Sequence, residues 1–155
     1  MSNGHRIAST HTGSLPRPDD LIRMMWAVGD GIPVDRVALD ERISTAVTEM
    51  VTRQVDAGVT VVNDGEMSKP SYATYVKDRL SGFEGESVQS YFFQDLVDYP
   101  RSAEMVAENP GRRKRSAPAC TGAITVTDPE AAVRDMVELR RAADEQRATA
   151  IFSSA

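Results

Sequence analysis

Apolar residues along this chain fall into two patterns, which are short continuous runs and longer stretches where they recur with a helical period. The longest periodic stretch runs from Asp35 to Ala57, with apolar residues along one face and Gly58 as a stop. Helices are also predicted over Asp19 to Val28, over Ser71 to Leu80, and from Asp128 to about Arg147. Alternation of this kind predicts an α/β fold.

Three short apolar runs are candidates for the strands of a parallel sheet. They cover Arg6 to Ala8, Val59 to Asn63 and Ala119 to Val126. The second run is β-branched, which is typical of a strand buried on both faces. Each run leads toward a predicted helix, so three βα units are expected. The pattern weakens between Ser87 and Arg115, and this segment is predicted to be an insertion or a long loop.

Size and charge narrow the class of protein. The chain has 155 residues, of which 41% are hydrophobic, and this is enough for one core and one domain covering 1–155. A net charge of −5 argues against nucleic acid as a main partner, and we interpret the basic run from Arg112 to Arg115 as a solvated loop. Neither a membrane span nor a signal peptide is predicted, so the expected location is cytoplasmic. The single cysteine, Cys120, is predicted to be a buried, inert thiol.

Two polar loops directly follow the first two predicted strands, and they are the candidate chemistry of the chain. The candidate substrate-binding residues are His11, Thr12, Gly13 and Ser14 in the first loop and Asp64 and Glu66 in the second. Gly13 permits close backbone approach, Ser14 offers a hydroxyl and an N–H to an anion, and Glu66 can pair with an amine. Because both loops follow successive strands, a small-molecule site at one sheet edge is favoured over two unrelated turns.

Two of these residues have alternative interpretations. His11 is equally compatible with a hydrogen bond to substrate and with a role in fixing the loop. Asp64 either caps the following segment or orients Glu66, and the structural role is favoured.

Three blocks carry a resemblance to a known family: His11-Thr12-Gly13-Ser14-Leu15-Pro16-Arg17-Pro18, then Gln54 to Glu66, then Tyr75 to Phe83. In order and spacing they resemble the catalytic domain of cobalamin-independent methionine synthase. More narrowly, they resemble the shorter bacterial methionine synthase II type, whose relatives include epoxyalkane:coenzyme M transferases. The resemblance covers most of the chain and leaves the acceptor thiol and the methyl donor open.

The resemblance implies a TIM (β/α)₈ barrel in which zinc activates a thiol that takes a methyl group from a folate. Methionine would then be made from homocysteine. The positions matching the family's carboxylate-binding loop are Thr12, Gly13 and Ser14, and Glu66 matches the residue that holds the ammonium group. Zinc lowers the pKa of a bound thiol, which is near 8.5 in solution, and so produces the nucleophile.

The family's zinc ligands, one His, two Cys and a Glu, are mostly absent here. Cys120 stands alone, and six residues of strand would separate His5 from His11 by about 20 Å at roughly 3.3 Å per residue. A complete barrel needs about 250 residues. We therefore expect an incomplete barrel of about three to four βα units, inactive by itself, that contributes the substrate clamp. The alternative is a noncatalytic half-barrel, a binding module or relic that pairs with a second chain completing the barrel.

Overall fold

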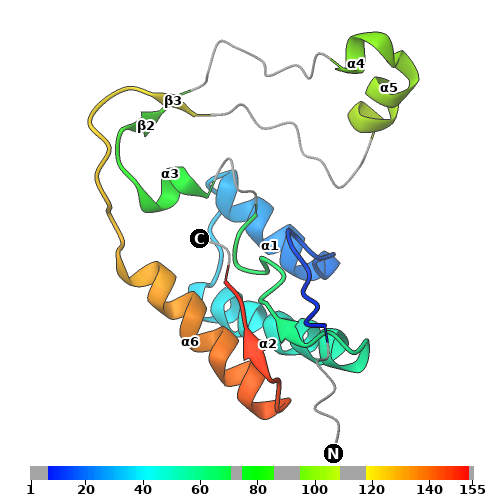
Figure 1. The fold of residues 1–155 in the computed structure, drawn as a ribbon. Helices are drawn as coiled ribbons and strands as arrows, with labels where there is room; N and C mark the ends of the chain where they lie inside the picture. Colours follow the sequence, from blue (N-terminus) through cyan, green and yellow to red (C-terminus); the bar gives the residue numbers. More distant parts are fainter. Residues whose placement is uncertain (1–6, 71–74, 86–94, 109–117, 154–155) are drawn as a thin grey trace, which may run out of the picture. The chain divides into compact units, whose positions relative to one another are not determined.

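The computed structural model describes residues 7–70, 75–85, 95–108 and 118–153, and it is a mixed α/β structure. The chain divides into two compact units (Figure 1). Unit 1 comprises Met1–Tyr72 and Asp128–Ala155, and unit 2 comprises Ala73–Thr127. Unit 2 therefore includes the segment predicted as an insertion. His5 and the basic run 112–115 lie outside the described residues.

Three of the predicted helices form most of unit 1. They are α1 (Asp19–Gly29), α2 (Arg36–Asp56) and α6 (Glu130–Glu145). The carboxylate of Asp35 caps α2 by accepting hydrogen bonds from the amides of Val37 and Ala38 at 2.9 and 3.2 Å. Gly58 has φ +80° and directs the chain out of the helix, as predicted.

A small parallel sheet lies against these helices. Strand β1 (Val61–Val62) pairs in parallel with β4 (Ala150–Ile151), and Thr10 forms a parallel bridge to Val61. The Val61 amide donates to Ser9 at 2.9 Å, whereas the Val62 carbonyl accepts from Phe152 at 2.9 Å. Because neighbouring residues of a strand point their backbone groups to opposite edges, Thr10 and β4 flank β1.

The predicted strands of unit 1 are partly corrected. The run Val59 to Asn63 does contain a buried parallel strand. The first pairing lies at Thr10 rather than in the run ending at Ala8, and Ile7 is 94% exposed. A short apolar run does not specify its own register, which depends on the partner strand.

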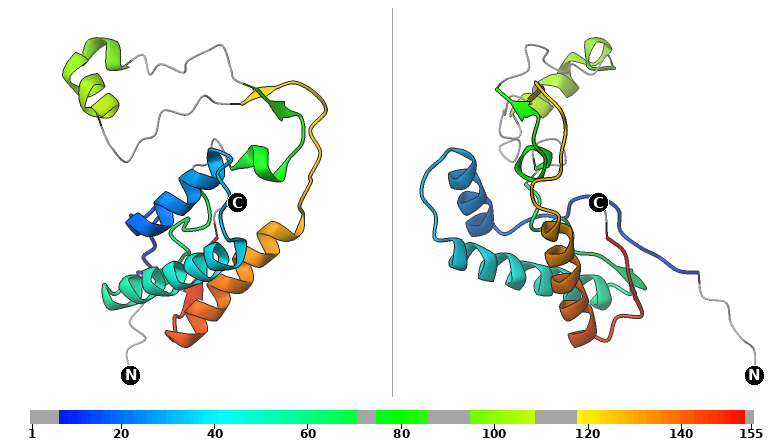
Figure 2. Two further views of the ribbon diagram at one scale, coloured as in Figure 1. Left: turned by 180° about the vertical axis from the view of Figure 1, so that it is seen from behind. Right: turned by 90° about the vertical axis from the view of Figure 1, so that its left-hand side faces the viewer.

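The core of unit 1 lies between α2, α6 and the sheet. Helices α2 and α6 pack against each other, and they cross at a steep angle in the right-hand view of Figure 2. The buried apolar residues of this core are Leu21, Met25, Leu39, Ala46, Val47, Met50, Val51, Val62, Met67, Leu139, Ala142 and Ala143. Two crossover helices on one face of the sheet keep the carboxyl ends of Thr10 and β1 at one edge.

Unit 2 contains an antiparallel ribbon and short helices. Strand β2 (Phe83–Glu84) pairs antiparallel with β3 (Ala119–Cys120), and Leu80 bridges Val126. The helices are α3 (Val76–Arg79), α4 (Asp95–Asp98) and α5 (Pro100–Glu108). Helix α3 corresponds to the end of the predicted helix over Ser71 to Leu80, whose residues 71–74 lie outside the described part.

The prediction of a parallel-sheet strand from Ala119 to Val126 is wrong. Only two of these residues form a strand, it is antiparallel, and residues 120–127 are exposed. An antiparallel pair can leave side chains in water, and the threonines and glycine of this run suit that position. Cys120 is likewise exposed, so the predicted buried thiol is wrong as well. The third parallel strand of unit 1 is β4.

Within the part of the chain that the structure describes, no helix combines the length and the apolar character that crossing a membrane requires.

Candidate functional site

The two candidate loops meet at the carboxyl edge of the parallel sheet. Residues 11–14 follow the Thr10 bridge, and residues 63–66 follow β1. The Ser14 hydroxyl donates to the carboxylate of Glu66, and the Leu15 amide donates to the carbonyl of Gly65 at 3.0 Å. The structure thus brings together a hydroxyl and a carboxylate that suit the opposite ends of an amino acid.

The backbone of the second loop is left-handed at two consecutive residues. Gly65 has φ +60° and Glu66 has φ +59°, a conformation that is uncommon outside glycine. A Cβ on Gly65 would lie 2.9 Å from Cγ of Met50 and 3.1 Å from Cβ of Leu15. Only glycine fits position 65, and the tight turn aims the Glu66 side chain at Ser14.

Side chains of the same loop hold this turn. The Asn63 carboxamide oxygen accepts from the Gly65 amide at 2.9 Å, and the Asp64 carboxylate accepts from the Glu66 amide at 3.0 Å. Asn63 also donates through Nδ2 to the His11 carbonyl. The backbone of Asn63 is in turn held by Gln54 of α2, with distances of 3.1 and 2.8 Å. The loop is therefore tied to both the first loop and the helix beneath it.

Asp64 belongs to a buried charged cluster that the sequence did not reveal. Its carboxylate is 3.6 Å from Nζ of Lys69, and this ammonium is 4.0 Å from the carboxylate of Asp135 on α6. Ser68 donates to the same Asp135 at 3.0 Å. Asp64 and Lys69 are only 3% and 5% exposed, so each stabilises the other's charge where water is excluded. The arrangement supports the structural interpretation of Asp64.

Arg17 is a second side chain whose place in the site was not predicted. Its Nε and Nη2 donate to the Glu66 carbonyl at 3.1 and 2.7 Å, and Nη2 also donates to the Lys69 carbonyl. Burial lowers the pKa of the Arg17 guanidinium, and the carboxylates of Glu66 and Asp64 offset part of this shift. The guanidinium therefore lies beneath the second loop and connects its two ends.

The remaining candidate residues line the first loop. Thr12 and Gly13 are exposed, and Gly13 has φ +95° with open space where a Cβ would be. His11 is half-buried, and its Nε2 is buried without a hydrogen-bond partner. That nitrogen is a donor or acceptor for an incoming polar group, while the His11 carbonyl fixes the loop through Asn63. The structure therefore contains features of both interpretations of His11.

The described residues do not provide a cluster of metal-binding side chains. Among residues 7–70, 75–85, 95–108 and 118–153, no three His, Cys, Asp or Glu side chains gather as a metal site would require. Two of the acidic residues at this edge, Asp64 and Asp135, are paired with Lys69 at 3.6 and 4.0 Å. The described residues do not fit the zinc site that the family resemblance implies.

No protein-family model matches the chain, and no curated protein matches it significantly. The contacts at the sheet edge are consequently the basis for a functional assignment.

Proposed function

We propose that the carboxyl edge of the unit 1 sheet binds the amino-acid end of a small thiol substrate. The observation that carries this proposal is the hydrogen bond between Ser14 and Glu66, which joins loops that follow two neighbouring parallel strands. On this proposal the chain is the N-terminal part of a zinc-dependent thiol S-methyltransferase related to cobalamin-independent methionine synthase, and homocysteine is the acceptor.

The chemistry of the pair supports an amino acid better than a simple thiol. A hydroxyl beside an open glycine backbone suits a carboxylate, and a carboxylate 52 positions further along the chain suits an ammonium group. The hydrogen bond between Ser14 and Glu66 occupies one carboxylate oxygen. An incoming ammonium group would compete with the hydroxyl for Glu66, while the hydroxyl would turn to the substrate carboxylate.

The topology of unit 1 supports an incomplete TIM barrel. Thr10, β1 and β4 lie in chain order across the sheet, and the helices that precede β1 and β4 pack against each other. Helices on a single face and strands added in one direction are features of a barrel rather than of a doubly wound sheet. The thiol-activating metal and the folate methyl donor of the parent enzyme would be held by residues other than those described.

Ligand binding provides the test. L-Homocysteine should bind the purified chain in calorimetry, and 4-mercaptobutanoate, which lacks the amino group, should bind much more weakly. Glu66→Gln should weaken homocysteine binding about 10-fold or more because it removes the charge that faces the ammonium group. Glu41→Gln, at an exposed position of α2, is the matched control. Equal affinity for both thiols would contradict an amino-acid clamp.

The same titration separates the two family members. 2-Mercaptoethanesulfonate carries an anionic group but no amine, so its binding affinity should not change in the Glu66→Gln variant. Preference for this thiol would favour an alkyltransferase of the epoxyalkane:coenzyme M type. Methyl transfer to homocysteine by this chain alone is not expected, and turnover above that of Glu66→Gln would contradict the assignment of zinc ligands to another part of the enzyme.

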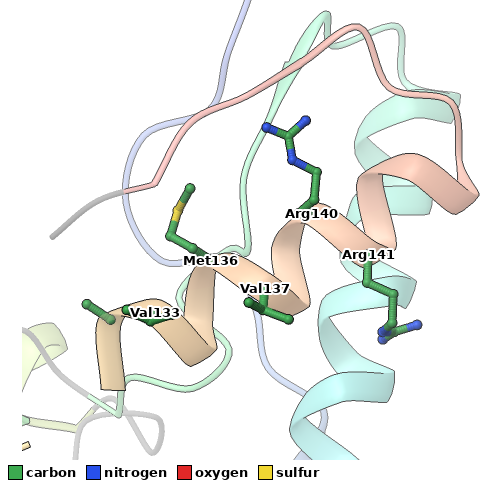
Figure 3. A pocket seen from close by; sticks show the side chains of 6 residues that line it. Val133, Met136, Val137, Arg140 and Arg141 are labelled. Carbon is green, nitrogen blue, oxygen red and sulfur yellow. The ribbon is translucent and has the colours of Figure 1, made fainter. Parts of the chain in front are cut away.

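A noncatalytic half-barrel that pairs with another chain is the second candidate, and the surface of α6 favours it. Figure 3 shows side chains along one side of this helix, where Val133, Met136 and Val137 are 52, 39 and 59% exposed. Arg141 instead donates to Ser44 of α2 at 2.7 Å. Sedimentation should detect association of the wild-type chain that Val137→Asp abolishes. A wild-type chain that stays monomeric at every concentration would contradict association through this face of α6.

A further inference from the structure

We infer that Arg17 is a positioning residue that holds Glu66 in its left-handed backbone conformation and thereby keeps the Glu66 carboxylate opposite Ser14. This inference rests on the proposed function in one respect, namely that the Glu66 carboxylate binds the ammonium group of the substrate. It concerns how the carboxylate is placed and does not assign Arg17 a contact with the ligand.

The conformation of Glu66 has to be maintained by its neighbours. An L-residue at φ +59° is disfavoured because its Cβ approaches the following carbonyl oxygen. Gly65 avoids this cost and Glu66 does not. A glutamate at such a position indicates that surrounding contacts determine the backbone, and backbone strain of this kind gathers at functional sites.

Contacts hold the peptide groups on both sides of Glu66. On the amide side, Asp64 accepts the Glu66 N–H at 3.0 Å. On the carbonyl side, Arg17 donates two hydrogen bonds to the Glu66 oxygen and a further one to the Lys69 oxygen. Because one planar guanidinium bridges carbonyls three residues apart, it fixes the path of the chain between them.

The chain around Arg17 is itself held in place. Pro16 and Pro18 flank it and restrict the backbone dihedrals on either side. The Leu15 amide is bonded to the Gly65 carbonyl at 3.0 Å, so the base of the arginine and the turn it supports have a common anchor. A lysine could not replace this fork, because a single ammonium group lacks its planar array of donors.

Burial and charge agree with this role. The guanidinium is part-buried, its pKa is lowered by desolvation, and the carboxylates of Glu66 and Asp64 stabilise its charge. Lys69 also lies close to Asp64, at 3.6 Å. The loop is therefore held among charges of both signs, and the guanidinium supplies the hydrogen bonds to its two carbonyls.

A double-mutant cycle in urea unfolding tests the inference without any ligand. Arg17→Met should lower the folding equilibrium constant about 10- to 100-fold, as expected for loss of charged hydrogen bonds to part-buried carbonyls. Glycine adopts the left-handed conformation freely, so Glu66→Gly should leave stability unchanged or raise it severalfold. In the Glu66→Gly background, the factor by which Arg17→Met lowers the folding equilibrium constant should be at least fivefold smaller than in the native background.

The controls match the chemistry of each change. Arg23→Met removes an exposed arginine of α1. Arg147→Gly relieves the other described non-glycine residue with positive φ, at +55°, away from the two loops. Neither control should couple to Arg17→Met or Glu66→Gly. Additive effects of Arg17→Met and Glu66→Gly would overturn the inference, because Arg17 would then stabilise the core without regard to the conformation of Glu66.

Arg17→Lys and homocysteine affinity complete the test. If Arg17→Met does not fold, recovery of folding by Glu66→Gly supports the inference. If the double variant also fails, the same cycle with Arg17→Lys decides between coupling and additivity. In folded variants, Arg17→Lys should raise the homocysteine Kd about 10-fold while Arg23→Lys leaves it unchanged. Wild-type protein that does not bind homocysteine would refute the proposed function, whereas the cycle would still decide the role of Arg17.

Discussion

The two units differ in what holds them together. In unit 1, apolar side chains between α2, α6 and the sheet are fully buried, and charged groups such as Lys69 and Asp64 lie among them. In unit 2, none of residues 75–85, 95–108 and 118–127 whose exposure is described is buried, and the ribbon is joined by backbone bonds and by hydroxyls such as Ser81 and Thr125. Substitutions should therefore have larger effects on the stability of unit 1, and their effects in unit 2 should be local.

The largest expected effect comes from the buried cation of unit 1. Lys69→Met removes the charge that faces Asp64 and Asp135, and it should lower the free energy of unfolding by about 3–5 kcal/mol in urea denaturation. Arg134→Met is the control, since Arg134 pairs with Asp128 at the surface. Equal effects of the two substitutions would show that removing the buried cation Lys69 destabilises the fold no more than removing a surface cation, which would contradict this prediction.

The apolar core should come next. Leu139→Ala on α6 deletes a side chain that is 0% exposed, and it should lower the free energy of unfolding by about 2–5 kcal/mol. Val137→Ala, two residues away at 59% exposure, should change it by less than about 0.5 kcal/mol. A similar loss at both positions would show that the exposed face of α6 is buried in solution, for example by another chain.

A glycine substitution probes unit 2 by itself. Gly82 has φ +85°, and a Cβ there would lie 2.7 Å from the Ala123 carbonyl oxygen. Gly82→Ala should destabilise the ribbon by about 1–3 kcal/mol and speed hydrogen exchange at Thr121 and Thr125. Gly85→Ala is the control, because Gly85 has φ +61° and open space around it. If exchange in the α2 core also accelerated, the two units would be unfolding together.

Acid should produce the smallest of these effects. The Arg42 guanidinium donates to Asp20 at 2.6 Å and lowers the pKa of that carboxyl below its usual value. The resulting stabilisation is present above the unfolded pKa of about 3.9 and is lost as pH falls through the folded value. The urea midpoints of wild type and Asp20→Asn should therefore differ at pH 7 and converge as the pH falls below the folded pKa of Asp20. Asp19→Asn, which neutralises the adjacent residue, serves as the control, and a gap that persists in acid would contradict the ion pair.

Much of unit 1 could be predicted because its signals are local. The apolar face of α2 and the Gly58 stop are both properties of neighbouring residues, and α1 and α6 follow in the same way. The meeting of Ser14 and Glu66 was predictable too, since both follow parallel strands.

The errors and omissions concern information that is not local. The run beginning at Ala119 resembles a buried strand, but its partner is the antiparallel segment at Phe83. Arg17 and Lys69 resemble surface charges in the sequence, and only the folded backbone shows which carbonyls and carboxylates surround them. Whether a charge is buried depends on tertiary neighbours that a single sequence does not specify.

Gly65 has a consequence for the redesign of this site. Any side chain there would displace Met50 and Leu15, so the second loop cannot be remodelled without repacking α2. Thr12, by contrast, is exposed, and diversification there leaves the helix contacts untouched. A library that varies Thr12 and retains Gly65 would search for new ligand specificities without altering the packing against α2, which makes the first loop the adaptable half of the site.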